Sequence, residues 1–461
     1  MGRLKVERST VQYYINRMNS LYSIKNPEER HTFVLNTFLS FQKDTWQVAL
    51  SPQVCRCLEQ LLSFASVDSV TVVLKTLSKS WDEVINSKFA YHLLHKALIK
   101  CLTPEYHADE LISSYVESFC THMKENLSTY VEQPHTTHTC RIYPQILAGV
   151  LLEKDSTSNT YKSTATQQFT PYDENYAQTL TDLCEEYLFT KALKGHVKHE
   201  FLCPFTQVLL LIASVRLPEL LKKKYKKLMK YTGLYSADAG KKSVAKTKYP
   251  NAYSHPVAVY FSELLIGVMP GSHFADFLNN RILTESASPT GDGVANSESF
   301  ANLLMSHPTG SCVLRAVIRR LAKSADIKNF LTVIQSCKST EWGLRGALSH
   351  GQYNVLTELA DLCSRHPSDE IQRIFLQMLP PVFGFTKKHN PSSGKEDLFI
   401  CCLVGMLPAN ALNEHIQNHS VKQELNEKDG ENNAKVASGE EEEEAMYIQS
   451  HCLDVYLFRL C

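Results

Sequence analysis

Several signatures of chemistry are missing from this 461-residue chain. Its fourteen cysteines form no Cys-x-x-Cys pair and no Cys/His grouping with the spacing of a zinc finger. The sequence also has no glycine loop that could cradle a phosphate, no nucleophile elbow and no deaminase signature. We therefore predict a protein that is not an enzyme and that uses no metal or other cofactor.

Long apolar runs are missing as well. The longest, VLLLIASV at 208–215, is far too short to cross a bilayer and ends at Arg216. The N-terminal MGRLKVERS lacks the apolar core of a signal peptide, and Val6 stands where a myristoylation signal has Ser or Thr. Cysteines inside apolar helical runs, such as Cys184, Cys337 and Cys363, are typical of reduced core residues. We expect a soluble intracellular protein with no membrane partner.

The formal net charge is zero, which by itself argues against a nucleic-acid partner. The charges are unevenly spread, however. Residues 414–444 carry ten acids and three lysines, a net charge of −7 that leaves the remainder near +7. We interpret the run Glu440–Glu444 as a flexible spacer, with competition against RNA for a basic surface as the sharper alternative.

A second charged run has the opposite sign. Residues 222–249 contain ten lysines, one acid and four tyrosines. Lysines in this density are typical of a phosphate-binding arm or a nuclear import signal, and a solubilising loop is the alternative.

What the chain does have is helical periodicity. In SHPTGSCVLRAVIRRL, at 306–321, Val313, Leu314 and Val317 recur at three- and four-residue spacing, while Ser311 and Arg315 share another face. Strand-like alternation is scarce. Polar or charged stretches that we expect to be loops or disordered inserts interrupt the pattern at 154–175, 222–252, 283–297, 387–395 and 413–444.

The helical segments contain an internal repeat. VCRCLEQLL at 54–62 aligns with AYHLLHKAL at 90–98 at an offset of 36 residues, the length of a helical repeat that must stack on its neighbours. Each copy has two adjacent positions and a third position three residues later. The seven triplets are Cys55/Arg56/Glu59, Tyr91/His92/His95, Thr137/His138/Arg141, Cys203/Pro204/Gln207, Val259/Tyr260/Glu263, Ser311/Cys312/Arg315 and Tyr353/Asn354/Thr357. Later offsets are longer, chiefly where an insert intervenes.

Five strings in a fixed order resemble one known family. They are FVLNTFLSFQKDTWQVALSPQVCRCLEQLL (33–62), FAYHLLHKAL (89–98), CRIYPQILAG (140–149), CPFTQVLLL (203–211) and HPTGSCVLR (307–315). Together they resemble the nucleolar protein nine family, pumilio-type factors of small-subunit ribosome assembly, over roughly residues 10–380. The resemblance implies an all-α fold, an α-solenoid of pumilio-like helical repeats curved into a C- or U-shaped superhelix whose inner surface holds RNA.

The same resemblance implies a domain organisation. Residues 1–385 would form the repeat array, with loop inserts at about 154–175, 222–252 and 283–297. After it we expect a degraded C-terminal repeat at 386–412, an acidic disordered insert at 413–444 and a short, truncated-looking terminal segment at 445–461.

Members of this family bind precursor ribosomal RNA in the nucleolus and shield a cleavage site needed for making 18S rRNA. For this chain the resemblance therefore implies nuclear and nucleolar localisation, RNA and proteins of pre-ribosomal particles as partners, and no small-molecule substrate.

Side chains at the triplet positions have the chemistry to contact unpaired bases, because residues four apart share one helix face. Glu59 could accept hydrogen bonds from guanine and Gln207 could pair with adenine or uracil, while Arg56, His92 and Tyr260 could stack on bases. We expect Arg141 and Arg315 to meet phosphate, or guanine from another edge. The predicted RNA-binding residues are Cys55, Arg56, Glu59, Tyr91, His92, His95, Thr137, His138, Arg141, Cys203, Gln207, Tyr260, Glu263, Ser311, Cys312, Arg315, Tyr353 and Asn354.

Three alternatives stay open at this stage. For any single helix, a polar pair at i and i+4 is usually a solvated face. A scaffold of HEAT or armadillo type would use the same curved surface for protein partners, and an apolar or acidic surface would favour it. A pumilio-type regulator of messenger RNA translation would show a tighter 36-residue period and more amide or acidic third positions than this chain has.

Overall fold

The computed structural model describes residues 6–383 apart from 155–160, 173–174, 235–254, 288–296, 338, 340 and 367. These residues form two compact units, and each is described separately. Unit 1 holds residues 6–234 and 255–268, and unit 2 holds residues 269–383.

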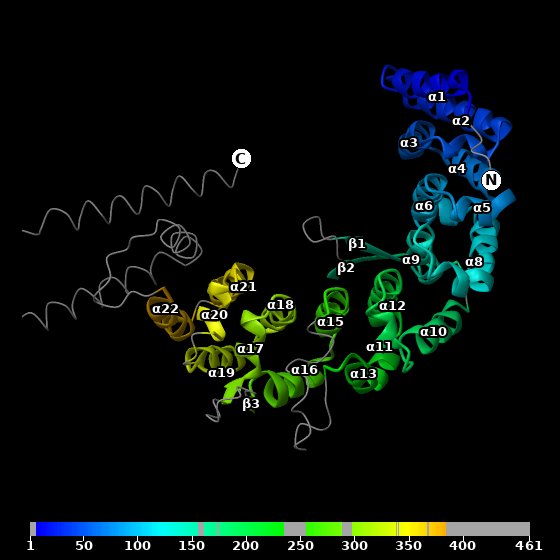
Figure 1. The fold of residues 1–461 in the computed structure, drawn as a ribbon. Coiled ribbons are helices and arrows are strands. Elements are labelled where there is room, and N and C mark those ends of the chain that lie inside the picture. Colours follow the sequence, from blue (N-terminus) through cyan, green and yellow to red (C-terminus); the bar gives the residue numbers. More distant parts are fainter. Residues whose placement is uncertain are drawn as a thin grey trace, which may run out of the picture. The chain divides into compact units, whose positions relative to one another are not determined.

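Unit 1 is built of helices and one hairpin (Figure 1). Its helices are α1 (Arg8–Leu21), α2 (Pro27–Asp44), α3 (Pro52–Leu61), α4 (Val67–Leu77), α5 (Trp81–Ile85), α6 (Ala90–Cys101), α7 (Pro104–His107), α8 (Glu110–Tyr130), α9 (Thr137–Ala148), α10 (Tyr176–Tyr187), α11 (Leu193–His196), α12 (Leu202–Arg216), α13 (Pro218–Thr232) and α15 (Ala258–Gly267). Short 3₁₀ turns lie at Trp46–Leu50, Leu62–Phe64 and Ser78–Ser80.

The helices of unit 1 are arranged in two rows. The first row consists of α3, α6, α9, α12 and α15, each of which packs against the next. Helices α2, α4, α8, α10 and α13 form the second row, in which α2 contacts α4, α4 contacts α8, and α8, α10 and α13 pack against first-row helices. Five of the seven triplets therefore lie on consecutive first-row helices, as a stacked repeat requires.

Helix α3 illustrates how the sequence produces this packing. Pro52 stands in its first turn, where a missing N–H costs nothing. Val54, Leu58 and Leu61 recur on one face and are fully buried, whereas Arg56 on the other face is exposed. Burying an apolar side chain of this size contributes about 1.5–3 kcal/mol, so the helix is held mainly by its neighbours.

A hairpin follows α9 directly. Strands β1 (Val150–Lys154) and β2 (Tyr161–Gln168) pair antiparallel, with Val150 opposite Gln168. Gly149 ends α9 with a φ of 58°, and an added Cβ there would lie 2.6 Å from the Phe169 carbonyl oxygen, so only glycine fits. Arg216 at the end of α12 donates to the carbonyl oxygens of Gly149 and Phe169 and thereby anchors the base of the hairpin.

The lysine-rich segment differs from the expected loop at 222–252. Residues 218–232 form α13, and the rest of the run, 235–249, lies outside the described residues. Leu221, Tyr225 and Leu228 are buried on one face of α13, and the Tyr225 hydroxyl donates to the Leu265 carbonyl oxygen of α15 at 2.6 Å. In the sequence, the density of lysines hides these apolar residues at three- and four-residue spacing.

Unit 2 repeats the same architecture. It contains α16 (Gly271–Phe277), a π-helical turn (Leu278–Ile282), β3 (Glu285–Ala287), β4 (Ser297–Ser299), α17 (Phe300–Ser306), α18 (Gly310–Arg320), α19 (Ser324–Gln335), α20 (Gly343–Ser349), α21 (Tyr353–Arg365) and α22 (Asp369–Phe383). The short strands β3 and β4 pair at the ends of the insert expected at 283–297. Helix α18 packs on α21, α17 on α20 and α19 on α22. The helices α17, α18 and α19 of one repeat therefore stack on the corresponding helices α20, α21 and α22 of the next.

The predicted fold class is confirmed. The described residues are helical apart from two short hairpins and the connecting turns, and the amphipathic helix expected in 306–321 is α18, with Val313, Leu314 and Val317 fully buried. The segments expected at 386–412, 413–444 and 445–461 lie outside the described residues. Among the described residues no helix is long and apolar enough to span a membrane, and no group of three or more His, Cys, Asp or Glu side chains could hold a metal ion.

Three histidines cap the starts of consecutive triplet helices. The Nδ1 atom of His199 accepts from the backbone N–H groups of Phe201 and Leu202, and His255 and His307 bond the starts of α15 and α18 in the same way. Each histidine stands four residues before the first position of a triplet. A side-chain acceptor at this place satisfies N–H groups that have no partner within the helix.

Replacing His307 by Ala should cost about 1 kcal/mol of unfolding free energy, because the N–H of Gly310 loses the acceptor 2.9 Å away. His307→Asn places an oxygen at similar reach and should retain most of the stability. Urea unfolding at pH 7.5 measures both variants. An equal loss in the two would contradict a capping role.

The same cap makes stability depend on pH. Burial lowers the pKa of His307 below its usual 6.5, and protonated Nδ1 cannot accept a hydrogen bond. As the pH falls below about 6.5, the unfolded chain therefore binds a proton before the folded chain does, and the stabilisation present above that pH is progressively lost. The urea midpoint should fall more steeply between pH 7.5 and pH 5 in the wild type than in His307→Asn.

Candidate nucleic-acid interface

The first triplet positions join neighbouring helices. Three buried first-position side chains in unit 1 point their donors at the residue that precedes the next first-row helix. The contacts are Cys55 Sγ to the Phe89 carbonyl oxygen (3.1 Å), Thr137 Oγ1 to that of Phe201 (3.4 Å) and Cys203 Sγ to that of Val257 (3.5 Å). The donor is a thiol or a hydroxyl in each case, and the acceptor lies at the N-terminus of α6, α12 or α15. These side chains therefore fix the stacking of one repeat on the next.

Burial keeps the thiols in their donor form. It raises the pKa of Cys203 to about 12, and the pKa of Cys55 is raised further by burial and by the nearby Glu59. At neutral pH both groups remain protonated. Gln207, only 6% exposed, points its amide at Cys203 Sγ, 3.3 Å away. The base contacts that we predicted for Cys55, Cys203 and Gln207 stay predictions. In this structure the hydrogen-bond donors of all three side chains contact other groups of the protein.

Triplet side chains of α3, α6 and α9 converge. The Glu59 carboxylate lies 3.4 Å from Cys55 Sγ and 3.9 Å from Lys96 Nζ of α6. The ring of Tyr91 stacks on His138 of α9, with the centroids 5.3 Å apart and the planes within 5° of parallel.

Charges couple the same three helices. Burial raises the pKa of Tyr91, the positive charge of Arg141 opposes that rise, and the negative charge of Glu59 adds to it. Arg141 also contacts the His138 ring. Side chains from residues 59, 91 and 141 are thus close enough to share one electrostatic environment, as the triplet alignment predicts.

The exposed members of this cluster are planar or cationic. Arg56, His92 and His138 are exposed, and Tyr91, His95 and Arg141 are half-buried. Rings and guanidinium planes in a row are suited to stacking on nucleobases, and the guanidinium groups also suit phosphate. We call the side chains of Arg56, Tyr91, His92, His138 and Arg141 the aromatic–arginine cluster.

The row becomes less polar beyond α9. On α12, Pro204 is half-buried and Gln207 is buried. On α15, Val259 is buried and Glu263 half-buried, while the ring of Tyr260 is 42% exposed. Tyr260 is therefore the accessible stacking group at this end of unit 1.

In unit 2 the triplet of α18 is tied to α21. Ser311 is 3% exposed, and its hydroxyl lies 3.0 Å from Gln352 Oε1, the residue before α21, and 3.0 Å from the Pro308 carbonyl oxygen. Cys312 is half-buried. Tyr353, 49% exposed, and Asn354, also exposed, occupy the first turn of α21.

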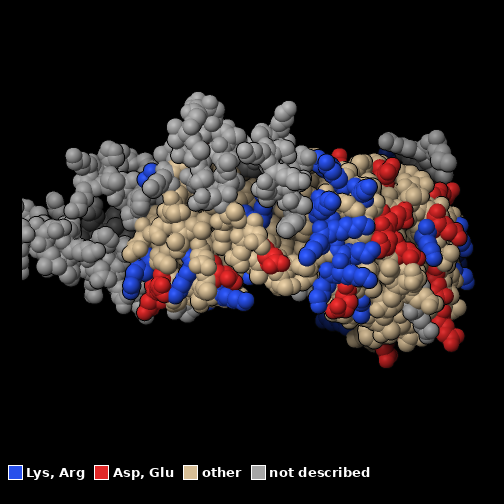
Figure 2. All heavy atoms as spheres, turned by 90° about the horizontal axis from the view of Figure 1, so that it is seen from below, with Lys and Arg blue, Asp and Glu red and all other residues tan. Residues whose placement is uncertain are grey.

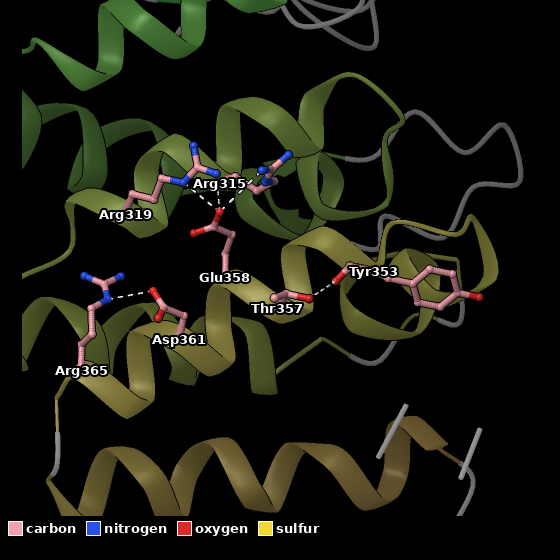
Figure 3. Close-up of polar contacts among 7 residues, drawn as sticks. All are labelled: Arg315, Arg319, Tyr353, Thr357, Glu358, Asp361 and Arg365. Carbon is pink, nitrogen blue, oxygen red and sulfur yellow. Dashed lines mark hydrogen bonds and ion pairs between the residues drawn. The ribbon is translucent and has the colours of Figure 1, made fainter. Parts of the chain in front are cut away.

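Arg315 is also held within unit 2. It lies 3.6 Å from the Glu358 carboxylate of α21, to which Arg319 Nε donates at 2.8 Å, so that two guanidinium groups converge on one acid (Figure 3). The expected contact of Arg315 with phosphate stays a prediction. In this structure Ser311 and Arg315 both connect α18 to the α21 segment of the next repeat.

Sequence reasoning missed the partners that hold these side chains. Lys96, Gln352 and Glu358 lie outside the triplet positions, although each contacts a triplet residue of the preceding helix. Only a structure pairs residues about 40 positions apart. The capping histidines were detectable, because His199, His255 and His307 share one offset from the triplets.

Replacing Glu358 by Ala should destabilise the docking of α21 by about 1–2 kcal/mol, because the two arginines lose a shared, largely shielded partner and repel each other. Asp361→Ala is the matched control, since it removes an exposed acid that pairs with Arg365 one turn away on the same helix and should cost about 0.3–0.5 kcal/mol. Amide hydrogen exchange in α21 reports both changes. Equal exchange in the two variants would contradict a joining role for Glu358.

Comparison with known proteins agrees with this geometry. Residues 43–453 match the NOP9-like PUF repeat domain. A curated relative, Nucleolar protein 9 of Pyrenophora teres f. teres (strain 0-1), is 25% identical over 165 residues, and the match covers 32% of this chain and 23% of the relative. The matched segment thus spans about a quarter of that relative's length.

Solved structures share the fold. The structure of APUM23-GGAGUUGACGG is 14% identical, with a TM-score of 0.55 over 83% of this chain and 67% of that chain. The Puf3 RNA binding domain bound to the Cox17 RNA 3′ UTR recognition sequence site B is 10% identical, with a TM-score of 0.50 over 89% of this chain and 96% of that one. At such identities the likeness establishes the fold, an α-solenoid of pumilio-like repeats. The match over most of the sequence, with the repeat geometry, shows that the chain belongs to the family of the NOP9-like PUF repeat domain.

Proposed function

We propose that this protein binds single-stranded RNA along its triplet helices and acts in ribosome biogenesis. The observation that carries the proposal is the aromatic–arginine cluster, in which planar and cationic side chains of α6 and α9 come together. Helix α3 adds the exposed Arg56 at the aligned triplet position. Unpaired bases can stack on such groups, and repeats that present two or three side chains per base are a known way of reading RNA.

The relatives support RNA as the partner. The Puf3 domain is bound to an RNA recognition sequence, and the curated relative is named Nucleolar protein 9. By analogy we assign this chain to the nucleus and nucleolus and take precursor ribosomal RNA as its target. The finer role, shielding a precursor cleavage site needed for 18S rRNA among the proteins of a pre-ribosomal particle, belongs to the same proposal.

The composition of the interface argues for a binding protein of limited sequence selectivity. Where the first position is buried, as at Cys55, Thr137 and Cys203, the second and third positions are left to contact RNA, and several of these are arginine or histidine rather than amide or acid. Tyr91 and Tyr353 are first positions that stay accessible. Such a set stacks on bases and binds phosphate more than it reads base edges. A scaffold for protein partners would instead present an apolar or acidic surface, which the aromatic–arginine cluster is not.

Changing Arg56 and Glu59 together to Ala should weaken binding to single-stranded RNA about tenfold or more, because one stacking contact is worth about 1–3 kcal/mol. The matched control is Lys124→Ala with Glu125→Ala, an exposed basic–acidic pair on second-row helix α8. Fluorescence anisotropy measures affinity, and circular dichroism confirms helicity. Unchanged affinity with retained helicity rejects α3 as an RNA-binding helix.

Crosslinking the protein to RNA in cells and sequencing the attached fragments should recover precursor ribosomal RNA, concentrated near one processing site. The Arg56/Glu59 double variant should recover less of it. Recovery dominated by untranslated regions of messenger RNA would replace this assignment with translational regulation.

A further inference from the structure

Arg315 is a largely enclosed positive charge. Figure 2 shows Lys and Arg side chains gathered beside acidic ones on one face of the molecule. Exposed charges of this kind, such as those of Lys222 and Lys226 on α13, are surrounded by solvent and screened by salt. The Arg315 side chain is only 25% exposed and stands at the third triplet position of α18. A guanidinium so placed keeps more of its attraction for an anion.

Arg315 and Arg319 share the Glu358 carboxylate unequally (Figure 3). Arg319 donates to Glu358 Oε1 through Nε at 2.8 Å and also through Nη2. Arg315 Nη2 lies 3.6 Å from the same oxygen, which is too far for a hydrogen bond and leaves only a longer ion pair. The acid is therefore neutralised mainly by Arg319.

The guanidinium of Arg315 is incompletely satisfied. Within the described part of the chain, its buried Nε–H has no hydrogen-bond partner. A buried donor without an acceptor is unfavourable, and two guanidinium groups against one carboxylate leave one positive charge in excess. Arg315 can turn toward a new anion at the cost of the longer ion pair alone, because Arg319 keeps Glu358 paired.

The neighbouring side chains indicate the class of the anion. Tyr353, 49% exposed, and the exposed Asn354 begin α21, the helix that packs on α18. A strand of RNA that lies on these accessible triplet positions passes Arg315 and carries one phosphate for each nucleotide. The planar fork of a guanidinium binds two phosphate oxygens at once. A backbone phosphate thus supplies the acceptors that Arg315 lacks.

We propose that Arg315 binds a backbone phosphate of an unpaired strand, and that Arg319 is the positioning residue that keeps Arg315 available by saturating Glu358. The proposal rests on the proposed function in taking RNA as the partner. It adds a sequence-independent contact in unit 2 and gives Glu358 the role of a competing anion. Without Arg319, the carboxylate would hold Arg315 and compete with the RNA.

The first test uses the full chain and two single-stranded RNAs, poly(U) and a mixed-sequence strand that contains guanine. Arg315→Ala should weaken binding to both about tenfold, because every sequence has the phosphate. It should also lower the logarithmic salt slope by about 0.7, the contribution of one phosphate contact to a single strand. Lys323→Ala, which removes an exposed charge just before α19, is the control and should leave both quantities unchanged.

The second test separates positioning from packing. Arg319→Ala should weaken binding to poly(U) at least about fivefold, because Glu358 then pairs with Arg315 alone. Adding Glu358→Gln should restore the wild-type affinity, since the amide carries no charge. A purely structural role for Arg319 predicts no recovery, because the double variant removes more of the contact between α18 and α21. The matched pair, Arg365→Ala with and without Asp361→Asn, alters an exposed ion pair of α21 and should leave affinity unchanged.

Glu358→Gln alone provides a check that retains both arginines. It should bind poly(U) at least as tightly as the wild type, because the competing charge is gone. Weaker binding would mean that the carboxylate orients Arg315 toward RNA, and the proposal would be wrong. Circular dichroism and amide exchange in α21 show whether each variant keeps the fold.

Other results would also overturn the proposal. A loss in Arg315→Ala that is confined to the strand with guanine would place Arg315 on a base edge. Equal loss in Lys323→Ala would reduce the effect to overall charge. A folded Arg319/Glu358 double variant that does not recover affinity would reject positioning by Arg319. Failure of the proposed function is separate, since it would appear as single-strand binding unaffected by the Arg56/Glu59 change.

Discussion

The structure depends on one constraint: no triplet helix can bury its apolar face alone, so each must be fixed against the next. Apolar packing supplies most of the energy, but it is non-directional and leaves the register between repeats loose. Four of the seven first triplet positions fix that register. A small buried donor, thiol or hydroxyl, reaches the start of the following helix at Cys55, Thr137 and Cys203, and Ser311 does the same through the Gln352 side chain.

The role of the first triplet positions in joining repeats determines where the candidate interface lies. Because most first positions are buried, the accessible chemistry falls mainly to the second and third positions, where arginine and histidine are the commonest residues. The half-buried ring of Tyr91, a first position, adds to them. The same alignment that stacks the helices sets these side chains in a line, so that Tyr91 meets His138 and Arg141 lies beside both. Packing and candidate function are two consequences of one register.

The sequence was sufficient to predict the helices, their repeat and the triplet alignment, because all three follow from apolar spacing along the chain. It misjudged 222–232, where lysine density masked the buried spacing of Leu221, Tyr225 and Leu228. It also could not show that Ser311 is buried or that Arg315 faces Glu358, since those outcomes depend on side chains about 40 residues away. The local sequence pattern determines which segments form helices. Which side chains meet between repeats is seen only in the three-dimensional structure.

The parallel rings of Tyr91 and His138 have a consequence for how a strand could thread past α6 and α9. Their centroids are 5.3 Å apart, too close for a nucleobase to slip between them as it would between two open repeats. A nucleobase bound between α6 and α9 would have to displace one of the two rings or stack on the outer side of the pair. For the proposed RNA-binding surface, the Tyr91–His138 pair is therefore a step at which stacking of a base between adjacent repeats first requires a ring to move.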